Sequence, residues 1–467
     1  MTIETTVATN GGSASPLDPV DVPQPGNVEE TGIELSALVD LTLKTIHFAG
    51  RPSGRQLGRQ LALPFAVVEE IVTFLRQEQM IEVVGSSGVG DQAYQYALTE
   101  RGRRKVEEAL SRSQYVGPVP VPFSLYTQVL DQQSVNHMEI DHATCLDRLS
   151  HLVLADSVLA TLGPAINSGR SMLIYGTPGN GKSSIASAIG KMLPGEILIP
   201  YAVEVHGQVV RVFDPRLHRR VTPDIGVDRR DAEPGTPGRG SERRHDQRWV
   251  LAKRPMVTLG GELTLRDLEL RYSPVAQFYS APPQWKANGG LLVIDDLGRQ
   301  VITPQELLNR WIVPMEQSID HLTLHTGDSV ELPFDVLLVF ASNIPPGKLG
   351  DEAFFRRIRH KVEIPNPTRG DYLEILQRMC AEDRVEYSDV GAAHLINVHY
   401  ERAGRPFRAC HPRDVVELIG DIARFYGQEA QLTPDLIDLA CAAYFVREES
   451  EDQVGPAAEG AGRQAAA

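Results

Sequence analysis

A glycine-rich segment at residues 176–183 has the residue types and the spacing that bind phosphate. It fits the pattern GxxxxGK followed by Ser or Thr, and it reads Gly176-Thr177-Pro178-Gly179-Asn180-Gly181-Lys182-Ser183. An apolar run before it predicts a strand, and the periodic run 184–193 after it predicts a helix, as this pattern requires. Glycines let backbone N–H groups point at phosphate oxygens, and the helix N-terminus adds positive potential. The segment therefore predicts a site for the phosphates of a nucleotide.

The side chains of this segment have separate expected roles. Lys182 would reach the β- and γ-phosphates, and the hydroxyl of Ser183 would bind Mg²⁺. Nucleotide contacts are expected from the whole loop and the serine after it, which are Gly176, Thr177, Pro178, Gly179, Asn180, Gly181, Lys182, Ser183 and Ser184. An ordinary glycine turn is the alternative, and it loses weight because a second motif agrees with the first.

The second motif supplies carboxylates. Four apolar residues, 291–294, precede two acids, and this pattern predicts a buried parallel strand that ends at Asp295 and Asp296. Ligands of α/β sheets bind at such carboxyl ends. We expect Asp295 to position Mg²⁺, together with Ser183, and Asp296 to orient or deprotonate an attacking water. The alternative, in which the two acids only cap a helix, is weakened by the phosphate loop.

At this point the chain resembles AAA+ ATPases, and the resemblance extends over about residues 141–446. It implies an α/β fold in which a parallel-sheet ATPase domain carries an α-helical lid. It also implies ATP and Mg²⁺ as cofactors, and hydrolysis of ATP to ADP and phosphate. One departure matters, because the family usually has Glu where this chain has Asp296. The shorter side chain sets the carboxylate back by roughly 1.5 Å, so slow hydrolysis is expected unless the backbone compensates.

Three further positions follow in the order that this resemblance implies. Asn343 ends an apolar run and matches sensor 1. The segment 351–367 resembles the arginine-finger region, in which Arg357, or Arg356 beside it, would reach the γ-phosphate of a neighbouring subunit. The sequence HPRDV resembles sensor 2 and would place Arg413 near the phosphates. The resemblance also implies assembly of identical chains into a ring, with a hexamer as the expected size.

Two insertions narrow the resemblance to a subgroup of AAA+ proteins. A helix from Thr303 to about residue 321 is followed by an alternating run, 322–334, which predicts a hairpin. Its place resembles the pre-sensor-1 hairpin of RuvB-like, MoxR-like and MCM-like proteins, which often faces the pore or substrate; a plain surface hairpin is the alternative. The segment 211–254 holds twelve Arg or Lys and seven Asp or Glu. It favours a flexible basic loop over nucleic acid or an acidic partner, or a loop whose charges compensate one another.

The N-terminal body, residues 31–112, has the pattern helix, helix, helix, hairpin, helix. This order resembles winged helix-turn-helix domains. Ten acidic and ten basic residues balance over this body, whereas a DNA-binding face is usually basic. The candidate recognition helix carries three acids against one arginine, which are Glu69, Glu70, Glu78 and Arg76. We therefore favour docking of a protein and keep DNA binding as the alternative.

Composition places the boundaries between the parts. A chain of 467 residues suggests about three domains, and 42% apolar residues can bury a core. The predicted parts are a disordered tail at 1–30, a winged-helix-like domain at 31–112, a proline-rich linker at 113–140, the α/β ATPase domain at 141–367, the lid at 368–446 and a disordered tail at 447–467. Helices of the lid are predicted at 369–381, 388–403, 412–427 and 434–445.

The same composition bounds the class of protein. A net charge of −15 argues against a surface that is basic all over. No apolar stretch approaches the length of a membrane span, and the four cysteines are scattered, which favours a cytoplasmic protein. We expect a chaperone-like ATPase that remodels a protein client or a macromolecular complex. A DNA-associated motor, loader or regulator is one alternative, and a slow ATP-dependent switch or scaffold is another.

Overall fold

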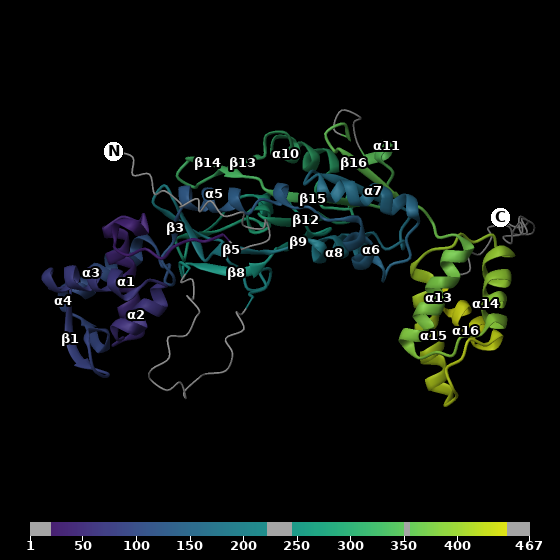
Figure 1. Cartoon of the computed structure of the whole chain (residues 1–467), viewed down its shortest axis with the longest axis horizontal. Coiled ribbons are helices and arrows are strands. Elements are labelled where there is room, and N and C mark those ends of the chain that lie inside the picture. Colours follow the sequence, from purple (N-terminus) through teal and green to yellow (C-terminus); the bar gives the residue numbers. More distant parts are fainter. Residues whose placement is uncertain (1–19, 222–244, 350–354, 446–467) are drawn as a thin grey trace, which may run out of the picture. The chain divides into compact units, whose positions relative to one another are not determined.

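The computed structural model describes residues 20–221, 245–349 and 355–445. These residues form two compact units, whose helices and strands are drawn in Figure 1, many of them with labels. The first unit is built from 20–177 and 182–364, and the second from 178–181 and 365–445. The glycine-rich loop is therefore divided between the two units, because its middle four residues belong to the second unit and the residues on either side belong to the first.

A five-stranded parallel sheet forms the centre of the first unit. Its strands, in spatial order, are β16 (His360–Ile364), β4 (Met172–Gly176), β15 (Val336–Ser342), β12 (Gly290–Ile294) and β9 (Met256–Leu259). Every neighbouring pair is parallel. All residues of β12 and β15 are buried, as expected for strands covered on both faces. The predicted α/β class and the buried strand before the two acids are confirmed.

Helices cover both faces of this sheet, because successive residues of a strand point to opposite sides. Leu291 and Val293 of β12 belong to a core shared with three helices. These helices are α6 (His142–Leu149), α7 (Asp156–Asn167) and α8 (Lys182–Met192). Leu292 and Ile294 face the other way and pack with α10 (Pro304–Gln317). The sheet is thus held rigidly between two helical layers.

A second five-stranded sheet is built from segments on either side of β9. Its order is β10 (Arg271–Ser273), β11 (Phe278–Ser280), β7 (Gln208–Arg211), β6 (Ala202–Val205) and β3 (Val121–Pro122). Next to it in the core, β5 (Glu196–Pro200) pairs antiparallel with β8 (Trp249–Lys253). The prediction of a flexible loop over 211–254 is wrong for β8, since Trp249 and Val250 are buried there. Residues 222–244 of that predicted loop lie outside the described residues.

The hairpin predicted before β15 is present. It consists of β13 (Ile319–Thr323) and β14 (Ser329–Pro333), which pair antiparallel. The preceding helix α10 ends at Gln317 rather than near residue 321. Ser318 causes this earlier end, because it adopts a left-handed conformation with φ 56°.

This hairpin is packed against the second sheet. Leu322 and Leu332 are buried in the core that the hairpin and the second sheet share. At the turn, the ring of His325 stacks on Tyr272 of β10, with ring centroids 4.1 Å apart. The hydroxyl of Tyr279 on β11 accepts a hydrogen bond from the backbone N–H of His325 at 2.8 Å. Both the strands and the turn of the hairpin are therefore anchored.

The prediction of an extended linker at 113–140 is wrong for its middle. Residues 123–132 form the helix α5 (Phe123–Gln132). Tyr126, Val129 and Leu130 on this helix are buried in the core beneath the second sheet. The alternating prolines end just before the helix, and the apolar residues after them have helical spacing. This burial, rather than local sequence, makes the segment part of the domain.

The predicted tail at 1–30 is likewise structured where it is described. Val22 is buried in the core of the second sheet, and Pro23 forms an isolated antiparallel bridge with His245. Residues Glu29–Thr31 form a short 3-10 helix. Residues 1–19 lie outside the described part of the chain, as does all of the tail predicted at 447–467. The segment 20–30 therefore belongs to the first unit.

The N-terminal module has the predicted order of three helices, a hairpin and a last helix. Its elements are α1 (Leu35–Ala49), α2 (Gly54–Leu61), α3 (Phe65–Gln77), β1 (Ile81–Ser86), β2 (Tyr94–Leu98) and α4 (Glu100–Arg112). A capping box of Ser53 and Gln56 starts α2. Val209 and Phe278 of the second sheet pack against the core of this module. The module is therefore joined to the rest of the first unit by apolar contacts.

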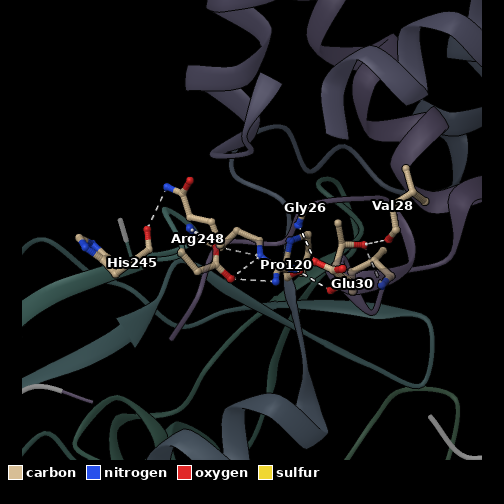
Figure 2. A network of polar contacts seen from close by, with 10 residues as sticks. Gly26, Val28, Glu30, Pro120, His245 and Arg248 are labelled. Carbon is tan, nitrogen blue, oxygen red and sulfur yellow. Dashed lines mark hydrogen bonds and ion pairs between the residues drawn. The ribbon is translucent and has the colours of Figure 1, made fainter. Parts of the chain in front are cut away.

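A buried ion pair joins three distant segments of the first unit. Arg248 Nη2 and Asp246 Oδ2 are 2.8 Å apart, and both side chains are buried. Arg248 also donates through Nη1 to the carbonyl of Thr31 at 2.7 Å and to that of Pro120 at 3.3 Å (Figure 2). The charge is thus paired and its N–H groups have acceptors, which a buried arginine requires. The network ties the N-terminal segment and the proline-rich segment to the start of β8.

The second unit is helical, as predicted for a lid. Its helices are α13 (Arg369–Asp383), α14 (Asp389–His394), a π-helix (Leu395–Glu401), α15 (Cys410–Tyr426) and α16 (Pro434–Tyr444). Threonine N-caps begin α13 and α16. A buried hydrogen-bond chain crosses the core, in which Tyr372 donates to Tyr400 at 2.9 Å. Among the helices that the structure describes in both units, none is long and apolar enough to cross a membrane.

Candidate nucleotide site

The glycine-rich loop leaves the parallel sheet at a position where only glycine fits. A β-carbon on Gly176 would lie 2.3 Å from the carbonyl oxygen of Ile364 on the neighbouring strand β16. A larger residue would therefore push β4 and β16 apart. After the loop, α8 begins at Lys182. The chain thus has the strand, loop and helix that its sequence predicts.

The ammonium group of Lys182 is enclosed by its own loop. Its Nζ donates to the carbonyl oxygens of Gly176 at 3.0 Å and Thr177 at 2.9 Å, and the residue is only 7% exposed. Burial lowers the pKa of Lys182, and the carboxylates of Asp296 and Asp295 oppose that shift. Phosphate oxygens can replace the two carbonyls as acceptors and would bring negative charge into direct contact with this buried cation.

Ser183 and Asp295 bring two oxygen ligands together. The hydroxyl of Ser183 donates to Oδ2 of Asp295 at 2.7 Å. The other carboxylate oxygen of Asp295 accepts the backbone N–H of Asp296 at 2.9 Å, and its backbone carbonyl accepts from Gln300 at 2.7 Å. Mg²⁺ prefers such hard oxygen ligands and keeps several waters, so the donor set fits the predicted metal. Sequence reasoning missed Gln300, which holds the backbone at this turn.

Asp296 and Asn343 form the second polar pair of the site. The amide of Asn343 donates to Oδ1 of Asp296 at 2.6 Å. Asp296 has a φ of 52°, in the left-handed region that few residues other than glycine adopt. Asp is among the side chains that tolerate this region best. The backbone conformation therefore gives a physical reason for Asp at this position.

The residues of the first unit that sequence reasoning selected gather at one edge of the parallel sheet. The loop follows β4, the two acids follow β12, and Asn343 follows β15, which lies between those strands. Because these three strands are parallel, their carboxyl ends meet at the same edge. Three of the selected residues of the first unit are exposed there: Thr177, Ser183 and Ser184.

The middle of the loop has its contacts within the second unit. Asn180 is buried, and its side chain donates to the Asn366 side chain at 2.8 Å and accepts the backbone N–H of Ala409 at 3.2 Å. The carbonyl of Gly179 accepts the backbone N–H of Cys410 at 2.8 Å. Sequence reasoning did not identify these partners, although two of them immediately precede the segment that resembles sensor 2. The loop is therefore fixed at its tip by the start of α15.

The two arginines expected to act on phosphates each have an acidic neighbour. Arg413 lies on α15 of the second unit, with Nε 3.5 Å from Oδ1 of Asp414 and a side chain that is 59% exposed. Arg357 belongs to the first unit and forms an ion pair with Glu316 of α10, with 34% of its side chain exposed. The expected roles of both arginines in catalysis stay predictions.

Comparison with protein families gives one match, which lies within the second unit. Residues 368–443 match a family described as "Domain of unknown function (DUF8689)". This range begins and ends close to the predicted lid and includes all of its helices except the last residue of α16. No curated protein matches the chain.

Solved structures with distant likeness include two bacterial proteins. NtrX from Brucella abortus in complex with ADP is 14% identical, with a TM-score of 0.38, over 75% of this chain and 62% of that chain. RuvB from Thermotoga maritima, described as a Holliday junction branch migration motor, is 14% identical, with a TM-score of 0.34, over 68% of this chain and 73% of that chain. The present chain thus spans less than two thirds of the NtrX chain. At these TM-scores the likeness supports no function. The assignment of the nucleotide site therefore depends only on the residues and contacts described above.

Proposed function

We propose that this chain is an ATPase of the AAA+ type that binds ATP with Mg²⁺ and hydrolyses it to ADP and phosphate. The observation that carries the proposal is the gathering of three groups at the carboxyl ends of adjacent parallel strands. These groups are the enclosed Lys182, the pair of Ser183 and Asp295, and the pair of Asp296 and Asn343. A buried cation, a hard-oxygen donor pair and a second carboxylate are the parts that phosphoryl transfer to water requires.

Each group has a role that follows from its chemistry. Lys182 and the backbone N–H groups of the loop hold the β- and γ-phosphates. Ser183 and Asp295 hold Mg²⁺, which supplies charge neutralisation on the phosphate oxygens when it is bound. Asp296 orients the attacking water and takes up its proton, and Asn343 fixes the carboxylate of Asp296 by donating to it.

The assembly that we propose is a ring of identical subunits, with six as the expected number. In such a ring Arg357 would act on the nucleotide of the neighbouring subunit, and Arg413 would act on the nucleotide of its own chain. The exposure of about a third of the Arg357 side chain supports this role, since a residue that acts on a neighbouring subunit must lie at the surface. Its partner Glu316 is itself 48% exposed, so the pair costs little to break.

The client that we propose is a protein, docked by the N-terminal module. The exposed side of α3 carries Glu69 and Glu70, and Glu70 accepts the backbone N–H of Val28 at 3.1 Å. The helix that a winged-helix protein inserts into DNA is thus acidic here and engaged by the N-terminal segment. Phosphates repel such a surface. A DNA-associated motor would instead show ATP hydrolysis that duplex DNA stimulates.

The decisive experiment compares nucleotide binding and hydrolysis in the full chain. Lys182→Ala is expected to weaken binding of a fluorescent ATP analogue, and Asp295→Asn to impair Mg²⁺-dependent phosphate release. Lys191→Ala is the matched control, because this lysine lies on α8 as well but is exposed. Parent rates in both site variants would show that the site is assigned wrongly.

A further inference from the structure

We propose that the second unit holds a divalent transition-metal ion between His394, His399 and Asp438. The Nε2 atoms of both histidines lie 2.7 Å from the same carboxylate oxygen, Oδ1 of Asp438. One ligand atom from each of the three residues lies within 4.8 Å of the other two. The site is separate from the nucleotide site in residues and in chemistry, and it does not depend on the proposed ATPase function.

The π-helix is the second observation that points to this site. His394 ends α14, and His399 follows within the π-helix Leu395–Glu401. In an α-helix, two residues five positions apart are about 140° apart around the axis. In the wider winding of a π-helix residue i+5 bonds to residue i, and this brings residues i and i+5 to the same side of the axis. π-Helical turns are rare and often occur at functional sites, and here the turn brings two imidazoles to one face.

Neighbouring contacts fix this arrangement. Tyr400, next to His399, is buried, and its hydroxyl forms a hydrogen bond with Nδ1 of His411 at 3.0 Å. The guanidinium of Arg405 donates to the backbone carbonyl of His399. Asp438 comes from α16 on the other side of the site. The ligands thus come from three elements that pack together, α14, the π-helix and α16, and a metal ion would cross-link α16 to the other two.

The ligand set selects the class of metal. Two imidazoles and one carboxylate suit Zn²⁺, Co²⁺ or Ni²⁺, with metal–ligand distances of about 2.0–2.2 Å for zinc. Mg²⁺ prefers oxygen ligands and would be held poorly. The side chain of Asp438 is 54% exposed, while those of His394 and His399 are 25% and 18% exposed. A fourth ligand can therefore approach from solvent, as water or as a group of a partner.

The test uses the untagged, metal-stripped full chain without nucleotide. Titration with Co²⁺ is expected to give a visible absorption band that saturates at one ion per chain, and Zn²⁺ is expected to displace the Co²⁺. His399→Ala and Asp438→Asn should each weaken Co²⁺ binding by at least about 10-fold, because even residues behind the ligands change metal affinity by that much. Far-ultraviolet circular dichroism checks that the helices of both variants remain.

Two controls separate this site from other sources of binding. Asp435→Asn changes an exposed acid one turn earlier on α16, and it should leave Co²⁺ affinity at the parent value. Ser183→Ala removes a proposed Mg²⁺ ligand and should also leave it unchanged. The proposal is overturned if the parent gives no saturable band, or if both ligand variants keep the parent affinity. Either result would leave the ATPase proposal intact, since that proposal is tested by nucleotide binding.

Discussion

Asp296 illustrates how a backbone conformation limits the choice of a catalytic side chain. Its φ of 52° places it in a region where a longer side chain has no local hydrogen bond to offset the steric cost. The turn is held on both sides, because Asp295 accepts its N–H and Asn343 donates to its carboxylate. The shorter arm is therefore matched to this turn.

The first prediction concerns the charge and length of this residue. Asp296→Asn keeps the backbone preference but removes the base, so hydrolysis should fall by about 10²–10⁴-fold while ATP binding remains. Asp296→Glu should not speed hydrolysis, because the left-handed φ disfavours glutamate. Phosphate release and binding of a fluorescent ATP analogue are the measurements. A faster Glu variant would mean that the turn does not constrain this position.

His411 makes the stability of the second unit depend on pH. Burial, with the charges of Arg408 and Arg405 adding to it, lowers the pKa of His411 to about 4, and the carboxylate of Asp414 opposes this. The hydroxyl of Tyr400 meets Nδ1, so the neutral ring fits the core. Because the pKa is about 6.5 in the unfolded chain, the unfolded state binds more protons between pH 6.5 and pH 4.

The second prediction follows from this excess of bound protons in the unfolded state. The free energy of unfolding of the second unit should be highest above pH 6.5 and should decrease towards pH 4, by up to about 3 kcal/mol from this residue. His411→Gln should flatten that dependence. Urea unfolding followed by circular dichroism measures it, and the three tryptophans, all in the first unit, report on that unit separately. Equal pH slopes in parent and variant would contradict the assignment.

At the scale of elements, the main feature of the hairpin β13–β14 is the set of contacts that hold its turn in place. The backbone N–H of His325 donates to the hydroxyl of Tyr279, whose ring is buried, and the His325 ring stacks on Tyr272. A hairpin that works on a substrate must move or be reached from solvent. Here the turn is fixed to a strand of the second sheet, so any movement of the hairpin would be shared with that sheet.

The third prediction tests this anchor. Tyr279→Phe removes only the hydroxyl, which bonds to both the backbone N–H and Nδ1 of His325. Loss of the bond to the N–H, worth about 1 kcal/mol, should by itself speed amide hydrogen exchange at 323–329 roughly five-fold. Thr326→Ala, which removes a hydroxyl bonded within the turn to Asp328, is the control and should have a smaller effect. Unchanged exchange in the Tyr279 variant would mean that the stacked histidine alone holds the turn.

The sequence predicted those elements that are specified by local features, such as apolar periodicity and capping residues. The loop between β4 and α8, the strand before Asp295 and the helices of the second unit carry their own periodicity and caps. The helix α5 and the segment 20–30 were predicted as linker and tail, because prolines and polar residues dominate their composition. They are ordered by burial against strands that lie far away in sequence, and such partners cannot be read from a local pattern.

The candidate site also has one part that could be predicted from the sequence and another that could not. Lys182, Ser183 and the two acids follow from spacing alone. The contacts of Asn180 with Asn366 and Ala409, all within the second unit, depend on how the chain returns to its own loop. Asn180 and Asn366 are 186 positions apart. Spacing within a motif cannot indicate such a return.

At the scale of the whole molecule, the proposed ring gives Arg357 a second partner. In its pair with Glu316 the two side chains are 34% and 48% exposed, so exchange of Glu316 for a phosphate of the adjacent subunit is feasible energetically. The fourth prediction is that Arg357→Ala lowers hydrolysis by about 10³–10⁵-fold and leaves ATP binding largely intact. Arg359→Ala, a change of an exposed arginine two residues away, is the control.

Mixing of variants tests whether the arginine acts between chains. A mixture of Arg357→Ala and Lys182→Ala proteins creates some interfaces with both groups intact, so its activity should exceed the sum of the separate preparations if subunits exchange. Sedimentation with a non-hydrolysable ATP analogue gives the assembly state independently. A strict monomer with full activity in the Arg357 variant would exclude both the arginine finger and the ring.

The buried pair of Arg248 and Asp246 has a consequence for the order of assembly during synthesis. Arg248 and Thr31 are 217 positions apart, and ribosomes add about 5–20 residues per second. About 10–40 s therefore pass between the emergence of the two partners. The N-terminal module can fold early around its own helices, but its contacts with Val209 and Phe278 come only later. The N-terminal module is thus made before its partners on the second sheet, and until they appear a nascent chain presents the apolar surface that they later cover to chaperones.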